Sequence, residues 1–129
     1  MILLDTHVLF WALDDPAHLS RAAASAIRRA RLNQNVSISA ITLWELASLL
    51  GKGKIQGYGT VETSLRLLTQ KVKVWPITTE IAALAAQFPS DYSKDPSDRI
   101  IGATARSEGL TLITRDENIR RSPLLRTLW

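Results

Sequence analysis

Short strand-like segments alternate along the chain with longer segments of helical spacing, and this alternation constrains the fold more than any other feature. Strands are predicted at residues 2–5, 36–39, 72–75 and 110–114, and helical patterns fill the intervals between them. Strands that alternate with helices favour a parallel sheet that is covered by helices on both faces. The sequence therefore predicts an α/β fold with a buried sheet.

Turn residues and potential caps set the expected boundaries of the helices. Pro16 ends the first helix, because proline disfavours the α conformation of the residue before it. Ser20 can cap the second helix, and Thr78 or Thr79 can cap a later one. Four of the six glycines, at 51, 53, 57 and 59, mark a loop. Helices are expected at about 6–13, 20–32, 61–70, 96–107 and 117–121, with two more that carry Glu45 and Ile81, and residues 128–129 can add an edge strand.

Four carboxylates lie at the borders of these buried segments. Asp5 and Asp116 follow two predicted strands directly, and sites in parallel sheets form beyond the carboxyl ends of the strands. Asp98 opens a helical pattern, and Glu45 is the only charged residue between positions 40 and 50. A buried carboxylate costs free energy unless it is paired or bound to a cation. Together the four residues predict a divalent metal site.

Such a site suits chemistry on a phosphate. Mg²⁺ and Mn²⁺ prefer oxygen ligands and commonly keep several waters. A metal can lower the pKa of a bound water and stabilise both oxygens of an in-line phosphodiester displacement. Thr6 and Thr114 adjoin the carboxylates and can orient a water or a phosphate oxygen. The alternative for both hydroxyls is that they cap helices.

Each carboxylate also has a structural alternative. Asp5 and Asp116 can cap the helices that follow them. Asp95 can cap the next helix, and Asp98 then lies in its first turn, where a carboxylate favours the helix dipole. Glu45 is harder to explain in this way, because its neighbours one turn away are apolar. A structural role would pair Glu45 with a buried arginine, and the sequence indicates none.

Composition limits the classes of protein. At 129 residues the chain is expected to form one domain, residues 1–129. Cysteine is absent, which excludes disulfides and thiolate metal sites and fits a reducing compartment. The start lacks the basic region of a secretory signal, and no apolar run approaches the ~20 residues that span a bilayer. We therefore expect a cytoplasmic protein that does not bind membranes.

The charge balance points to a polyanionic partner. The chain has 16 Lys and Arg against 12 Asp and Glu, a net charge of +4. If a metal holds the four carboxylates, the remaining surface is more basic still, which favours nucleic acid. The alternative is an ordinary solvated basic surface. Arg21, Arg28 and Arg31 share one arc of a predicted helix, and Lys52 and Lys54 lie in the glycine-rich loop.

Four segments of the chain, in order, resemble one known family. They are residues 1–13 (MILLDTHVLFWAL), 36–47 (VSISAITLWELA), 95–105 (DPSDRIIGATA) and 110–119 (LTLITRDENI). Together they resemble PIN-domain ribonucleases, specifically the VapC-type toxins of VapBC toxin–antitoxin pairs. The four segments span nearly the whole chain at the spacing that is usual in the family, so the resemblance rests on more than one motif.

The resemblance implies a three-layer α/β/α sandwich with a small, mostly parallel sheet. It implies that Asp5, Glu45, Asp98 and Asp116 form an acidic pocket for Mg²⁺ or Mn²⁺, with Thr6 and Thr114 in support. It further implies an endoribonuclease that cuts tRNA or rRNA loops, a cognate antitoxin that inhibits it, and a homodimer. Residues 91–94, DYSK, depart from a stretch that often contains histidine. We expect this departure to affect RNA or antitoxin contacts, and all four carboxylates are retained.

Two other function classes stay open. One is a catalytically inactive RNA- or protein-binding module on the same fold, although none of the four acids is missing. The other is an aspartate-dependent phosphatase with Asp5 as the nucleophile, but His7 stands where that chemistry usually has a second aspartate.

The aromatic and apolar side chains give further expectations. His7 and His18 are expected to be ordinary partly buried or surface residues. Trp11, Trp44 and Trp75 are expected to pack in the core or in an interface. The dimer is expected to use the N-terminal helices and residues 61–70, including Leu65 and Leu68.

Overall fold

A wholly parallel five-stranded sheet forms the centre of the molecule. The computed structural model describes all residues, 1–129. The strands are β1 (Ile2–Leu4), β2 (Val36–Ser39), β3 (Lys73–Trp75), β4 (Thr111–Ile113) and β5 (Thr127–Leu128). They lie in the order β3-β2-β1-β4-β5, and every neighbouring pair is parallel. The predicted α/β fold is therefore confirmed, and its sheet is parallel throughout.

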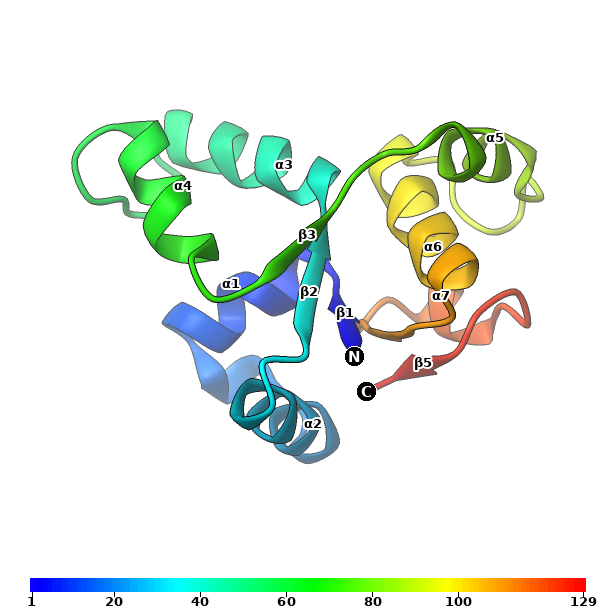
Figure 1. Cartoon of the computed structure of the whole chain (residues 1–129), viewed down its shortest axis with the longest axis horizontal. Helices are drawn as coiled ribbons and strands as arrows, with labels where there is room; N and C mark the ends of the chain where they lie inside the picture. Colours follow the sequence, from blue (N-terminus) through cyan, green and yellow to red (C-terminus); the bar gives the residue numbers. More distant parts are fainter.

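Seven helices cover the sheet (Figure 1). They are α1 (Thr6–Asp14), α2 (Arg21–Leu32), α3 (Ala40–Gly51), α4 (Val61–Thr69), α5 (Thr79–Gln87), α6 (Pro96–Glu108) and α7 (Glu117–Arg121), with a short 3₁₀ turn at Pro16–His18. The 3₁₀ turn was not predicted. Of the two candidate caps of α5, Thr78 is the one that accepts the amide proton of Ile81. None of these helices is long and apolar enough to cross a membrane.

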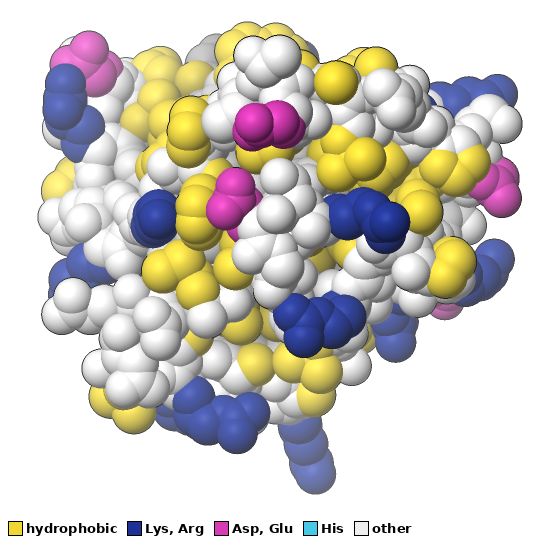
Figure 2. All heavy atoms as spheres, turned by 45° about the vertical axis from the view of Figure 1, so that its right-hand side comes forward, with side chains coloured by type: hydrophobic (Ala, Val, Ile, Leu, Met, Phe, Trp, Pro, Cys, Tyr) yellow, Lys and Arg dark blue, Asp and Glu magenta, His cyan; other side chains and the backbone are white.

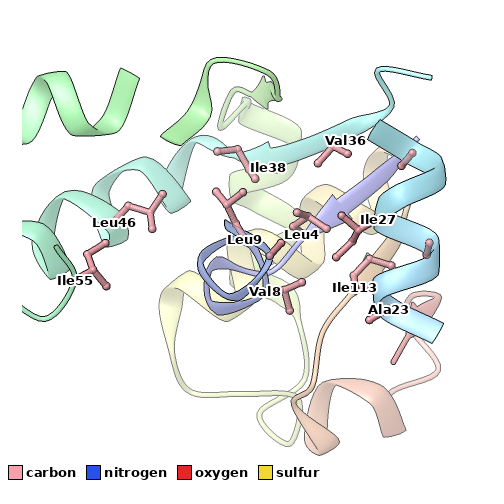
Figure 3. Packing of buried hydrophobic residues seen from close by; sticks show 13 residues of the cluster. Leu4, Val8, Leu9, Ala23, Ile27, Val36, Ile38, Leu46, Ile55 and Ile113 are labelled. Carbon is pink, nitrogen blue, oxygen red and sulfur yellow. The ribbon is translucent and has the colours of Figure 1, made fainter. Parts of the chain in front are cut away.

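Two hydrophobic cores lie on opposite faces of the sheet and confirm the three layers. Successive side chains of a strand point to opposite faces. Leu4 and Ile113 therefore join α1 and α2 in one core, whereas Leu3 and Leu112 join α5, α6 and α7 in the other. Figure 3 shows the first core, where Leu4 and Ile38 of the sheet lie against the helices. Each core excludes water from one face of every central strand.

The strand order indicates where along the carboxyl-terminal end of the sheet a site should form. From β1 the chain adds β2 and then β3 on one side, and it then crosses over to place β4 on the other side of β1. Connections therefore leave the carboxyl ends of β1 and β4 in opposite directions. In open parallel sheets, ligands bind at such a change of direction. Asp5 follows β1, and Thr114 to Asp116 follow β4, at this position.

The tryptophans differ in burial. Trp44 on α3 does not pack in the core, because 65% of its surface is exposed, so only the interface part of the expectation stays open for it. The helix turns its apolar face inward at Leu46, which is buried, and Trp44 two residues earlier points away. Trp75 is half-buried at the end of β3, with the Lys73 ammonium 3.7 Å from its ring centre.

Candidate functional site

A cavity of about 460 Å³ opens at the carboxyl ends of β1 and β4. It is lined by Asp5, Thr6, His7, Val8, Trp11, Glu45, Asp95, Asp98, Arg115 and Asp116. All four predicted carboxylates and Thr6 are therefore brought together from four separate parts of the chain. Thr114 does not line the cavity but supports it from behind through hydrogen bonds. The cavity also contains residues that the sequence did not indicate, above all Asp95, Trp11 and Arg115.

Asp5 is both a helix cap and a cavity residue, so its two proposed roles are compatible. Its Oδ1 accepts the amide proton of Thr6 at 2.9 Å and caps α1. Its Oδ2 accepts the hydroxyl proton of Thr114 at 2.8 Å. The Thr114 hydroxyl in turn accepts the amide proton of Asp116 at 3.1 Å. This one buried hydroxyl thus links the residue after β1 to the residues after β4.

Asp116 has the same double placement. Its Oδ1 accepts the amide proton of Ile119 at 3.1 Å and caps α7, while its side chain lines the cavity. The cap fixes the carboxylate at the start of the helix, where the helix dipole favours a negative charge.

Glu45 is held by hydroxyls and not by an arginine. The Thr6 hydroxyl donates to Glu45 Oε1 at 2.6 Å and lies 3.0 Å from the Thr42 hydroxyl. Because the single proton of Thr6 is used on Glu45, Thr42 donates to Thr6. Thr42 is fully buried one helical turn before Glu45, and no sequence pattern indicated its role. Thr6 therefore orients a carboxylate, and the idea that it caps a helix was wrong.

Asp98 is held by the segment that departs from the family pattern. Ser93 donates from its hydroxyl to Asp98 Oδ2 at 2.9 Å. Asp95 caps α6 as predicted, accepting the amide proton of Ser97 at 2.9 Å, and it also lines the cavity. Ser93 lies within residues 91–94, so this segment contacts one of the four carboxylates directly.

Arg99 fixes the loop that carries Ser93. Its guanidinium donates to the main-chain carbonyls of five residues in and before this loop: Ala85 at 3.0 Å, Ala86 at 3.5 Å, Pro89 at 3.2 Å, Ser93 at 2.8 Å, and Phe88. Because Arg99 follows Asp98 on α6, this contact ties the end of α5 and the loop to the helix that carries the carboxylate. No motif in the sequence indicated this role.

Burial and mutual repulsion raise the pKa values of three of the carboxyls. Burial raises the pKa of Asp5 above its usual value, and the charge of Asp116 adds to the effect. Burial also raises the pKa of Glu45, with a smaller contribution from the charges of Asp5 and Asp95. The pKa of Asp98 is raised to about 6, first by burial and then by the same neighbouring charges. A cation in the cavity would relieve this repulsion.

The oxygen atoms of the cavity suit Mg²⁺ or Mn²⁺. They do not surround an ion completely. The four carboxylates and their supporting hydroxyls offer only oxygen atoms, which these ions prefer. No three of the acidic groups lie close enough together to form a closed metal site. Mg²⁺ is commonly held by only one or two carboxylates and keeps several waters, so an open wall of carboxylates suits it.

The basic residues singled out from the sequence lie elsewhere. Arg21, Arg28 and Arg31 on α2 and Lys52 and Lys54 after α3 are exposed, and none lines the cavity. On the face that Figure 2 shows, acidic side chains lie near the centre, with Lys and Arg side chains on several sides of them. The basic residues singled out from the sequence therefore lie on separate elements and do not gather at the cavity.

Comparisons with known proteins agree with this architecture. The family model of the PIN domain matches residues 2–123. The chain is 38% identical to Ribonuclease VapC22 of Mycobacterium tuberculosis, over 99% of this chain and 98% of that protein. A DNA-bound VapBC structure from Salmonella typhimurium has a chain with 26% identity and a TM-score of 0.70, covering 99% of this chain and 98% of that one.

A second solved structure is similar in fold. It is the VapBC2 complex of Rickettsia felis, bound to a DNA fragment from its promoter, with 18% identity, a TM-score of 0.75, and coverage of 99% of this chain and 98% of that chain. The match of the family model to nearly the whole length, together with the relative at 38% identity, shows the family. The chain therefore belongs to the PIN-domain family and is related to its VapC ribonucleases.

Proposed function

We propose that this protein is an Mg²⁺- or Mn²⁺-dependent endoribonuclease that acts as the toxin of a type II toxin–antitoxin pair. One observation carries the proposal: Asp5, Glu45, Asp98 and Asp116 line one cavity, and three of them have raised pKa values. The 38% identity to Ribonuclease VapC22 supports RNA as the substrate. Proteins that lack a use for a cation rarely gather so many carboxylates, because their repulsion costs stability.

The four carboxylates are the residues that would hold the metal. When bound, Mg²⁺ or Mn²⁺ activates water for in-line attack on a phosphodiester and stabilises the charge that develops on the phosphate oxygens. The protein contributes by orienting the carboxylates. Thr114 holds Asp5, Thr6 holds Glu45, and Ser93 holds Asp98, each through a hydroxyl that donates to one carboxylate oxygen. Each carboxylate keeps lone pairs free for a cation.

The proposed substrate is single-stranded or looped RNA, with tRNA or rRNA loops as the expected targets. The net charge of +4 supports this, because cations attract the RNA backbone while the carboxylates of the cavity accept the metal. Direct attack by water leaves a 5′-phosphate and a 3′-hydroxyl. End-labelling of the products measures this, and a cyclic phosphate would refute direct attack by water.

The proposed partners are a cognate antitoxin and a second copy of the chain, in the cytoplasm. The similar structures from Rickettsia felis and Salmonella typhimurium each contain a VapBC pair, which supports an antitoxin partner for this chain. For the dimer, Leu65 and Leu68 are less suitable than the sequence suggested, because both pack against the first core. The large apolar side chains that α3 and α4 themselves leave exposed are Trp44 on α3 and Val61 and Leu67 on α4. Dimer mapping should therefore change these three residues.

Cleavage of total cellular RNA by the purified, antitoxin-free chain tests the function. We expect discrete new 5′ ends with Mg²⁺ or Mn²⁺, lost with a chelator and lost in Asp98→Asn. The matched control is Asp91→Asn, which makes the same change at an exposed position outside the cavity and should keep the activity. If Asp98→Asn cuts like the wild type, the metal-dependent mechanism is wrong. If the wild type binds RNA without cutting it, the binding-module alternative is correct.

A further inference from the structure

Arg115 is the only Lys or Arg among the residues that line the acidic cavity. It stands between Thr114, whose hydroxyl holds Asp5, and Asp116, which caps α7. Its main chain is therefore fixed on both sides by the contacts that build the site, although its side chain is exposed. The position places a guanidinium at the mouth of a cavity that otherwise carries five acidic groups.

The guanidinium of Arg115 has no acidic partner. The three ion pairs of the structure join His18 to Asp15, Arg66 to Glu62, and Arg121 to Glu117. An arginine beside several carboxylates would ordinarily form a charge-assisted pair with one of them. Here the nearby carboxylates are already held by hydroxyls and main-chain amides, as described for Asp5, Glu45 and Asp98. The donors of Arg115 therefore stay available.

An aromatic cluster holds Arg115 in place. The guanidinium carbon lies 5.8 Å from the centre of the Trp11 ring, within the range of a cation–π contact. Trp11 is itself fixed by His18, which stacks on it at 5.3 Å with an angle of 15°, and by Trp129 at 6.0 Å. The Arg115 guanidinium is close to the indole and makes no side-chain hydrogen bond or ion pair with the protein, so its N–H groups stay available for a ligand.

A guanidinium at this position can reduce the repulsion between the acidic cavity and RNA. A phosphodiester carries a negative charge, and the carboxylates repel it unless cations offset them. A metal held by the carboxylates would offset this repulsion at the reacting phosphate. The next phosphate along an RNA chain still lies near the mouth and needs a cation there. Arginine is suited to this, because its planar fork of donors matches two phosphate oxygens.

We propose that Arg115, supported by Trp11, binds a backbone phosphate of single-stranded RNA at the mouth of the cavity. This inference rests on the proposed function, since it takes RNA as the ligand. It makes Arg115 a substrate-binding residue that positions the RNA for cleavage. The exposed basic residues of α2 and of the loop after α3 then contribute general attraction and no fixed contact at the site.

The test measures RNA binding apart from cleavage. A fluorescein-labelled single-stranded RNA of mixed sequence is titrated with protein in EDTA, and anisotropy is recorded from 50 to 200 mM salt. Three variants are compared with the wild type. Arg115→Gln removes the charge, and Arg115→Lys keeps the charge without the planar fork. Arg120→Gln is the matched control, an exposed arginine on α7 that does not line the cavity.

A single phosphate contact to single-stranded nucleic acid contributes about 0.7 to the slope of log Kd against log salt. The affinity advantage of the wild type over Arg115→Gln should therefore shrink about 2.6-fold between 50 and 200 mM salt. Arg115→Lys should restore the slope and only part of the affinity. Arg120→Gln should follow the wild type. The inference is overturned if Arg115→Gln and Arg120→Gln change the affinity and the slope equally, because the effect is then one of net charge.

Cleavage kinetics separate this inference from the proposed function. With Mn²⁺, Arg115→Gln should raise KM more than it lowers kcat, and Asp98→Asn should abolish kcat. A wild type that binds RNA without cutting it refutes the nuclease, while the contrast in salt slope still decides the role of Arg115. If the wild type cuts RNA but Arg115→Gln leaves KM and the salt slope unchanged, only the role of Arg115 is refuted.

Discussion

Replacing Arg99 with glutamine should destabilise the fold by about 2–4 kcal/mol and weaken the metal site at the same time. The guanidinium donates to five main-chain carbonyls, and three of these contacts have distances between 2.8 and 3.2 Å. A hydrogen bond contributes about 1 kcal/mol net, and one from a charged donor about 1.5–3 kcal/mol. Arg99 is only half-buried, so water can reach some of the freed carbonyls, which places the expected loss below the full sum.

Urea denaturation followed by circular dichroism measures the free energy of unfolding. Arg99→Lys keeps the charge but not the fork of donors, so we expect a loss of intermediate size. Arg28→Gln is the control, because Arg28 is exposed on α2 and has no role in the loop. If Arg99→Gln costs no more than Arg28→Gln, the carbonyl contacts do not stabilise the fold and the reasoning is refuted. Calorimetry measures the expected weakening of Mn²⁺ binding. Binding should weaken because the loop, once released, no longer holds Ser93 against Asp98.

Three further changes test other parts of the structure. Gly102→Ala should destabilise the fold by about 1–3 kcal/mol, because the added Cβ would lie 2.1 Å from the hydroxyl oxygen of the buried Tyr92. Thr114→Val should weaken Mn²⁺ binding about 10–100-fold in calorimetry, because Asp5 loses the donor that orients it. The metal-free protein should lose thermal stability as the pH rises from about 4 through about 6, because the pKa of Asp98 is about 6 in the folded state and the folded protein therefore holds a proton that the unfolded chain has released.

Each of these has a matched control. Gly51→Ala places a Cβ where no atom lies within 4 Å and should not destabilise the fold, so equal losses at the two glycines would contradict the packing argument. Thr111→Val changes a half-buried threonine of β4 outside the cavity and should leave Mn²⁺ binding unchanged. Asp98→Asn should flatten the decline of stability with pH, and an unchanged decline would mean that other groups cause it.

The sequence predicts the framework of the site because the framework follows local rules. Strand-like runs and helical spacing are local patterns, and Asp5 and Asp116 follow strands directly, so their meeting at one edge follows from a parallel sheet. Glu45 was conspicuous because an isolated charge in an apolar helix has few structural uses. These inferences need only the spacing of the apolar residues along the chain and the sheet topology that this spacing favours.

The supporting contacts follow no local rule. The Ser93 hydroxyl reaches Asp98 because the loop before α6 folds back toward the helix. The loop is held in this position because Arg99 donates hydrogen bonds to its main-chain carbonyls. Carbonyls are present at every residue, so no sequence pattern marks the ones that an arginine will contact. Trp11 is similar: its spacing on α1 suits a packed residue, and only the tertiary structure brings it to the cavity beside Arg115.

The place of β1 in the sheet has a consequence for synthesis of the protein. β1 pairs with β2 on one side and with β4 on the other, and the hydrogen bond between Thr114 and Asp5 joins residues 109 positions apart. During synthesis, one side of β1 therefore has no hydrogen-bonded neighbour until β4, near the end of the chain, has left the ribosome. A nascent or truncated chain has no complete carboxylate cavity and exposes an unpaired strand, which favours aggregation. The carboxylate cavity is therefore complete only when synthesis is almost finished.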